Sequence, residues 1–350
     1  MLRFHLLTVV ATAAWAFGTF DRAGAGEAPQ KITGPHVHEN LAVYFIHGTS
    51  APGPVPLTLA EALEKGRVKV FETGEVNELK IENIGDEAVF IQAGDIVKGG
   101  KQDRAVTASL VLTPRSGEVA LASFCVEQGR WSSRGSESVA RFSSAAEAVP
   151  SREAKLAMRA PIATGSVAAG LRSADSDLVY ERQRKVWDSV AKTQQKLSAG
   201  LSADVAASHS ETSLQLSLEN DKLQTARAAY VKALQAVGES GDDIVGYAFA
   251  VNGKLNSADV YASNGLFRKM WEKQLQSAAT EAIGETGDKS AAAPDVSAVA
   301  AFLDDAKRGA KKDTPLTVKK QAEVRDGERS VYFASSPAAG VWLHENYLAK

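Results

Sequence analysis

The segments GDIVKGGKQDR (Gly94–Arg104) and CVEQGRW (Cys125–Trp131) lie at the two ends of a strand-like part of the sequence and decide how we interpret the fold. Gly94, Gly99 and Gly100 predict sharp bends or bulges in a sheet, because glycine adopts backbone angles that other residues avoid. A Walker-type phosphate loop is not indicated, since no G-x-x-x-x-G-K-[ST] pattern is present. We predict that the two segments lie close together across the sheet.

Around these segments, short apolar runs alternate with turn signals, which is typical of an antiparallel sandwich or a barrel-like sheet. Between Val68 and Trp131 we count about six such runs. Asn40–Ile46 predicts an earlier strand, and Thr58 with Glu61 forms a capping box at the start of a short helix. The sequence therefore predicts an N-terminal β-rich domain over residues 36–131.

The second half changes to helical spacing of apolar residues. Residues 132–177 are rich in Ser and Ala and are interpreted as an irregular connection. Residues 178–350 are predicted to form an α+β half, with a linker near residues 284–295. Its elements are helices at Leu178–Leu197 and Glu219–Val237, a hairpin around Asn252-Gly253, a helix capped by Ser263, a helix near Val296–Lys307 and C-terminal strands. The predicted fold class is α+β.

The first residues are typical of a secretory signal peptide, with Arg3 and His5 before the apolar run Leu6–Phe17 and small residues up to Ala25. We expect residues 1–25 to be removed and the protein to be periplasmic or secreted, with no transmembrane segment remaining. With 40 basic and 42 acidic residues, the net charge of -2 gives no field that attracts nucleic acid. No nucleic-acid partner is expected.

Metal and thiol chemistry are also disfavoured. His36, His38 and His47 have no accompanying carboxylate cluster, so we interpret them as surface residues and predict no metal site. Cys125 is the only cysteine, which excludes an internal disulfide, and its apolar neighbours predict a core position. A reactive thiol is the alternative. No motif identifies a cofactor.

Aspartates also occur near the predicted hairpin. Asp242 and Asp243 precede it, and Asp259 lies in its second strand. Paired carboxylates serve acid–base chemistry when burial separates their pKa values. Adjacent aspartates at a loop are more often solvated turn residues, and we interpret them in that way.

The polar residues of the two opening segments are the candidate site. An arginine beside a tryptophan binds carboxylate or phosphate while the indole stacks on a flat ligand. The predicted ligand-binding residues are Lys98, Gln102, Arg104, Gln128, Arg130 and Trp131. The predicted function is a non-catalytic binding or interaction module of the bacterial envelope, for a small molecule or an envelope protein. In a purely structural alternative, Arg104 pairs with Asp95, Asp103 or Glu127.

An enzyme is the alternative function, namely a hydrolase acting on a phosphate- or ribose-bearing small molecule. Asp103 and Glu127 would then be the general acid and base, with Arg104 and Arg130 holding the anion. Convergence of these side chains in one pocket would favour the enzyme.

Two blocks of the sequence resemble one known family. Leu57–Trp131, with NELKIEN, GDIVKGGKQDR and CVEQGRW, and Ile244–Ala282 are similar, in this order, to an uncharacterised domain family. That family is named for its association with ADP-ribosylglycohydrolase (ARG) and rhodanese-phosphatase proteins. The resemblance implies a link to ADP-ribose or phosphate metabolism, and it assigns no catalytic residue.

Overall fold

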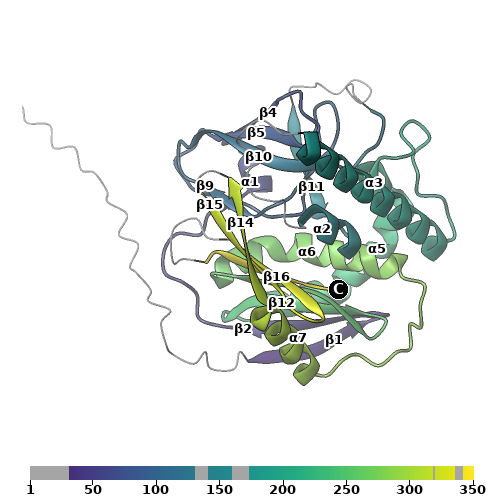
Figure 1. Ribbon diagram of the computed structural model, residues 1–350. Helices are drawn as coiled ribbons and strands as arrows, with labels where there is room; N and C mark the ends of the chain where they lie inside the picture. Colours follow the sequence, from purple (N-terminus) through teal and green to yellow (C-terminus); the bar gives the residue numbers. More distant parts are fainter. Residues whose placement is uncertain (1–30, 131–140, 160–172, 318–319, 336–341) are drawn as a thin grey trace, which may run out of the picture.

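Two layers of strands with a long helix between them form the framework of the protein (Figure 1). The computed structural model describes residues 31–130, 141–159, 173–317, 320–335 and 342–350. The described helices are α1 (Leu59–Glu64), α2 (Arg152–Arg159), α3 (Ser173–Leu201), α4 (Leu214–Leu218), α5 (Asp221–Glu239), α6 (Asn264–Gly284) and α7 (Val296–Arg308). The predicted signal peptide lies outside the described residues.

The larger sheet has eight strands within the described residues and is antiparallel throughout. In spatial order they are β1 (Ile32–His38), β2 (Leu41–His47), β12 (Ile244–Val251), β13 (Lys254–Tyr261), β17 (His344–Ala349), β16 (Ser330–Ser335), β15 (Lys320–Asp326) and β14 (Ala310–Thr317). Strands from both ends of the chain therefore share one sheet.

The remaining described strands form two smaller sheets. The order of the six-stranded sheet is β11 (Phe142–Ala148), β7 (Asp95–Gly99), β8 (Arg104–Val106), β10 (Gly117–Cys125), β5 (Glu78–Asn83) and β4 (Val68–Glu72). The three-stranded sheet contains β3 (Leu57–Thr58), β6 (Val89–Ile91) and β9 (Leu110–Leu112), and its β3–β6 pair is parallel. The predicted α+β class is confirmed.

Strand β2 is buried on both faces, because successive side chains of a strand point to opposite sides. Leu41, Val43 and Phe45 belong to the apolar cluster that contains α6. Tyr44 and Ile46 belong to the cluster on the other face, where α7 packs. The sheet is thus covered by a helix on each side, as Figure 1 shows.

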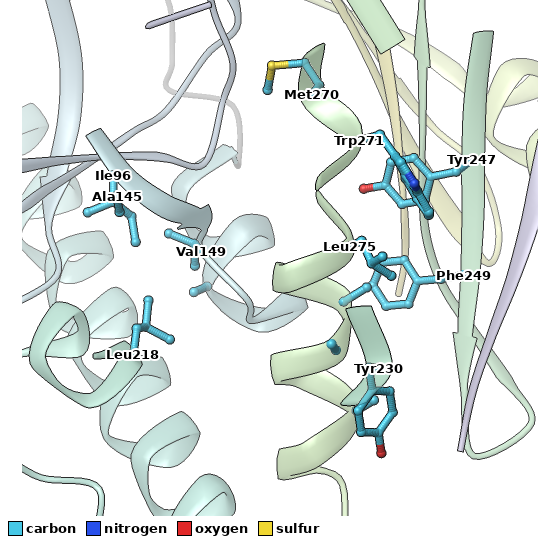
Figure 2. Close-up of a cluster of buried hydrophobic side chains, with 14 of the residues drawn as sticks. Ile96, Ala145, Val149, Leu218, Tyr230, Tyr247, Phe249, Met270, Trp271 and Leu275 are labelled. Carbon is cyan, nitrogen blue, oxygen red and sulfur yellow. The ribbon is translucent and has the colours of Figure 1, made fainter. Parts of the chain in front are cut away.

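Helix α6 holds the two layers together. Its N-cap is Ser263, as predicted, and the side chain of Ser263 accepts a hydrogen bond from the amide of Leu266. Figure 2 shows Trp271 and Leu275 beside Tyr247 and Phe249 of β12. Residues of β7 and β11 belong to the same cluster on the other side of α6. One apolar core therefore connects the large sheet with the smaller ones.

Three predicted boundaries differ from the structure. The predicted domain over residues 36–131 is divided, because β2 pairs with β12 and not with the strands of residues 68–125. The predicted irregular connection over residues 132–177 contains β11, α2 and the start of α3. The two strands predicted at residues 118–127 are one strand, β10.

Among the described helices, none is long and apolar enough to cross a membrane.

Candidate functional site

The segments Gly94–Arg104 and Cys125–Arg130 meet in the structure. Strand β8 pairs with β10, which places Arg104 opposite Cys125. The predicted glycine bends are present: Gly99 has a φ of 120° and Gly100 a φ of 62°. A Cβ atom on Gly99 would come within 2.3 Å of the carbonyl oxygen of Arg141. Glycine is therefore required where the chain turns toward Asp103.

The two predicted catalytic carboxylates, Asp103 and Glu127, are completely buried. The amide of Gly99 donates to Asp103 Oδ1 over 2.8 Å. Arg130 Nε donates to Glu127 Oε2 over 2.7 Å, and Ser210 Oγ donates to the other oxygen of Glu127 over 2.5 Å. These bonds occupy both carboxylates inside the protein, which favours a structural role for them.

Arg104 is also completely buried. Its guanidinium donates to the carbonyl oxygens of Glu75 and Val76 over 3.1 and 2.8 Å and lies 3.3 Å from Glu72 Oε2. The sequence suggested other carboxylates as its partners. One of them, Asp95, lies elsewhere and pairs with Lys273 of α6 over 2.6 Å.

The other predicted ligand-binding residues that the structure describes have partners within the protein. Lys98 forms an ion pair with Glu219. Gln102 is buried, and its Nε2 donates to the backbone carbonyl of residue 127 over 3.1 Å. Gln128 is exposed, and its amide and carbonyl groups bond with the hydroxyl of Thr212. Trp131 lies outside the described residues. The roles of these residues in binding remain predictions.

Cys125 occupies a core position. Its side chain is fully buried, and its Sγ lies 2.8 Å from Gln102 Oε1. Burial, opposed in part by the charge of Arg104, raises the pKa of the Cys125 thiol to about 11. The thiol is therefore uncharged at neutral pH, which disfavours the reactive-thiol alternative.

A second polar cluster, built from distant parts of the chain, contains Ser109, His344 and Asp259. Ser109 Oγ lies 2.9 Å from His344 Nδ1, and His344 Nε2 lies 2.8 Å from Asp259 Oδ1. Ser109 precedes β9, Asp259 lies in β13, and His344 begins β17, which pairs with β13. Their exposed fractions are only 6%, 2% and 2%. We call these three residues the Ser–His–Asp chain.

The charge of Asp259 fixes the direction of its hydrogen bond with His344. Burial alone would raise the pKa of Asp259, but hydrogen bonds and the charges of His344 and Lys155 outweigh burial and lower the pKa to about 2. Asp259 is thus a carboxylate at neutral pH and can only accept. His344 Nε2 therefore donates to Asp259 Oδ1, and Ser109 Oγ lies beside the other ring nitrogen, Nδ1.

Further contacts hold the Ser–His–Asp chain in place. The ring of His344 stacks on Tyr261, with centroids 5.1 Å apart. Asp259 accepts from Tyr247 Oη over 2.7 Å, from Asn346 Nδ2 over 2.8 Å and from Gln92 Nε2 over 3.3 Å. An imidazole held between aromatic rings and a saturated carboxylate is well positioned to act as a base.

Helix α2 places two cations beside this cluster. Lys155 and Arg159 are 5% and 9% exposed. Arg159 Nη2 donates to the carbonyl oxygen of Ala93 over 2.9 Å, and Arg159 Nη1 donates to Asn346. The amide of Ala93 in turn donates to Ser109 Oγ over 3.0 Å. Burial lowers the pKa of Arg159 to about 10, which leaves it protonated at neutral pH.

The sequence did not reveal this cluster. Asp243 agrees with the turn interpretation, since it lies at the loop and pairs with His47 over 2.8 Å. Asp259 lies in the second strand of the hairpin, as predicted, and is buried. The apolar neighbours of Asp259 in β13, Ala258, Val260 and Tyr261, were the available signal. In the part of the chain that the structure describes, no group of three or more His, Cys, Asp or Glu side chains is arranged to hold a metal ion.

Comparison with known proteins identifies the family but no individual relative. Searches of curated proteins and of solved structures give no match. The family model of the ARG and Rhodanese-Phosphatase-superfamily-associated Protein domain matches residues 30–347, which is most of the chain. The resemblance seen in the two sequence blocks is confirmed, and the chain belongs to the ARG and Rhodanese-Phosphatase-superfamily-associated Protein domain family.

Proposed function

We propose that the protein is a hydrolase that cleaves an ester of a phosphate- or ribose-bearing small molecule, with Ser109 as the nucleophile. One observation carries the proposal: a serine hydroxyl lies 2.9 Å from an imidazole that a buried carboxylate orients over 2.8 Å. This arrangement activates serine for acyl transfer. The association in the family's name supports the substrate class.

The proposed reaction uses His344 Nδ1 as the base. Ser109 Oγ attacks the ester carbonyl carbon, and His344 Nδ1 takes the hydroxyl proton. The ester C–O bond breaks, and the departing alcohol receives that proton from His344. Water then attacks the acyl-serine, gives a proton to His344 and restores the hydroxyl of Ser109. The net change is ester plus water to acid plus alcohol.

The arrangement differs from the familiar serine hydrolases in two respects. In chymotrypsin the histidine faces the serine through Nε2, whereas His344 faces Ser109 through Nδ1. Ser109 lies in the sequence TASL and not in the G-x-S-x-G turn of α/β-hydrolases. Both ring nitrogens accept protons, so the chemistry is conserved when their positions are exchanged. Asp103 and Glu127 have no step in this reaction.

Covalent labelling tests the assignment of Ser109. The full chain is incubated with diisopropyl fluorophosphate, which forms a P–O bond to an activated serine and loses fluoride. We expect one added phosphoryl group, mapped by peptide mass spectrometry to Ser109. Ser109→Ala should abolish the labelling. Asp259→Asn should slow it by roughly 10²-fold or more, because the histidine loses its orienting carboxylate.

Ser123→Ala is the matched control. Ser123 is another buried serine, on β10, with no hydrogen-bond partner for its Oγ among the described residues. The Ser123→Ala protein should be labelled at the wild-type rate. Near-UV circular dichroism of each variant checks its packing. If the folded wild-type protein is not labelled at Ser109, the polar cluster is only a structural link between the sheets and the hydrolase assignment is wrong.

A second candidate function, ligand binding without catalysis in the bacterial envelope, is favoured by a groove between α2 and α3. The groove has a volume of about 560 Å³ and is lined by charged residues that include Glu153, Arg182, Lys185 and Asp188. A thermal-shift screen with nucleotides, ADP-ribose, sugars and peptidoglycan fragments tests it, since a ligand of the native state raises Tm. A hit that Lys185→Ala and Arg182→Ala leave unchanged would place the binding site elsewhere.

Export from the cytoplasm is part of the proposal and rests on the basic and apolar pattern of residues 1–25. In a Gram-negative host, we expect the processed protein in the periplasmic fraction. Its intact mass should correspond to a chain that begins near residue 26. A full-length protein that stays in the cytoplasm would contradict this expectation.

A further inference from the structure

The buried cations of α2 are not neutralised by direct ion pairs. Lys155 and Arg159 are four residues apart, so they lie on the same face of the helix. No carboxylate oxygen of a described residue lies within 4.0 Å of either charge. Lys155 Nζ has no described hydrogen-bond partner, and Arg159 Nε is buried without one. Arg159 has neutral acceptors but no carboxylate partner, and two adjacent buried cations without a carboxylate partner are unfavourable unless an anion joins them.

The neighbouring carboxylates do not take that role. Asp259 already accepts hydrogen bonds from four side chains: His344, Tyr247, Asn346 and Gln92. Glu281 lies on α6, and its Oε1 accepts from Asn256 and from the amide of residue 152. Burial raises the pKa of Glu281 despite the nearby charge of Lys155, which favours its neutral form. Burial lowers the pKa of Lys155, although the charges of Glu281 and Asp259 oppose the shift, so an anion bound beside Lys155 would favour its charged form.

The cation pair, Lys155 and Arg159, lies next to Ser109, the proposed nucleophile. Arg159 donates to the carbonyl oxygen of Ala93, while the amide of the same residue donates to Ser109 Oγ. One residue of backbone thus separates the guanidinium from the hydroxyl. Because Nη1 and Nη2 of Arg159 are used by protein acceptors, its Nε and the ammonium of Lys155 are the donors left for a ligand.

We propose that Lys155 and Arg159 form the oxyanion-binding subsite of this protein, so that the ester cleaved at Ser109 carries a phosphate or carboxylate group close to its acyl carbon. The substrate class rests on the proposed hydrolase function, whereas the binding of an oxyanion does not. Phosphate and carboxylate share the chemistry that two cationic donors recognise. Separate titrations with a phosphate probe and a carboxylate probe distinguish the two groups.

Binding is measured without catalysis, in the full-length Ser109→Ala protein. Inorganic phosphate and acetate are titrated separately by calorimetry and by thermal unfolding, against sodium chloride of equal ionic strength. We expect one of the two anions to bind and to raise Tm by roughly 2–4 °C at high occupancy. The anion that binds more tightly identifies the group that the substrate carries.

Lys155→Met is the diagnostic variant, and Lys232→Met, at an exposed position of α5, is its matched control. In Lys155→Met the affinity should fall at least tenfold, and Tm without anion should rise, because an unpaired buried charge is removed. A Tm that falls instead, with binding retained, would mean that Lys155 is a structural residue. Absence of binding of both anions to wild-type protein would overturn the subsite and leave the labelling of Ser109 as a separate result.

Discussion

At the scale of single residues, Arg104 is the clearest example of a buried charge that the fold requires. Its guanidinium is surrounded by two carbonyl oxygens and by Glu72. Removal of one partner from such a group leaves the other partner buried and uncompensated. The residue therefore stabilises the junction of β8 and the segment that precedes β5.

We expect Arg104→Ala to lower the free energy of unfolding by about 3–5 kcal/mol. Arg115→Ala is the matched control, because Arg115 forms an exposed pair with Asp86 and its removal should change stability by less than about 1 kcal/mol. Urea denaturation of both variants measures the difference. Equal effects of the two substitutions would show that the buried network contributes little.

The environment of a residue could be predicted from the sequence only where its neighbours along the chain indicated it. The core position of Cys125 and the bends at Gly99 and Gly100 followed from their immediate neighbours. The Ser–His–Asp chain did not, since Ser109 and His344 are 235 residues apart and nothing near either residue indicates the other. Such contacts are determined by sheet order, which periodicity does not provide.

At the scale of elements, a buried ion pair joins β11 with two helices. Glu147 of β11 pairs with Arg227 of α5 and accepts from Thr280 Oγ1 of α6 over 2.7 Å. Burial raises the pKa of Glu147 to about 7, although Arg227 and Thr280 oppose the shift. The folded protein therefore holds a proton at Glu147 over a pH range in which the unfolded chain releases it.

The raised pKa of Glu147 makes the free energy of unfolding fall as the pH rises. Because the pKa of Glu147 in the folded protein lies above the value of 4.5 for an unperturbed glutamate, the stabilisation is complete below pH 4.5 and is lost as the pH rises to 7. The loss amounts to about 3 kcal/mol. Glu147→Gln should remove this slope from a plot of unfolding free energy against pH, while Glu118→Gln, at an exposed site, should leave it. An unchanged slope in Glu147→Gln would contradict the assignment.

Elements with explicit start signals were predicted correctly. The capping box of Thr58 and Glu61 begins α1, Ser263 caps α6, and Asn252-Gly253 turns the β12–β13 hairpin. Strand β11 and helix α2 were missed, because a Ser- and Ala-rich sequence has little apolar contrast between faces. Their positions depend on packing against α6 and α3.

At the scale of the whole molecule, the predicted division into a β-rich domain and an α+β half is replaced by a shared core. A single apolar cluster contains Phe124 of β10, Phe45 of β2, Phe249 of β12 and Trp271 of α6. Residues from both predicted halves are thus buried against one another. The sequence indicated the fold class, but the order of the strands came only from the structure.

A shared core predicts one cooperative unfolding transition. In scanning calorimetry we expect a single peak whose van't Hoff enthalpy equals the calorimetric enthalpy. Leu121→Ala in β10 and Leu348→Ala in β17, both at fully buried positions, should each shift the whole peak to lower temperature. Two separable peaks, with each substitution moving only one, would show that the halves unfold independently.

The position of β2 in the large sheet has a consequence for the protein during its synthesis. Leu41–His47 is buried on both faces in the completed sheet. Its neighbour β12 is synthesised only after residues 48–243 have been synthesised. Until then an apolar strand with an open edge is available for pairing with other chains. Chaperones that hold nascent chains should therefore engage this segment early, and a delay in completing the chain should lead to aggregation through it.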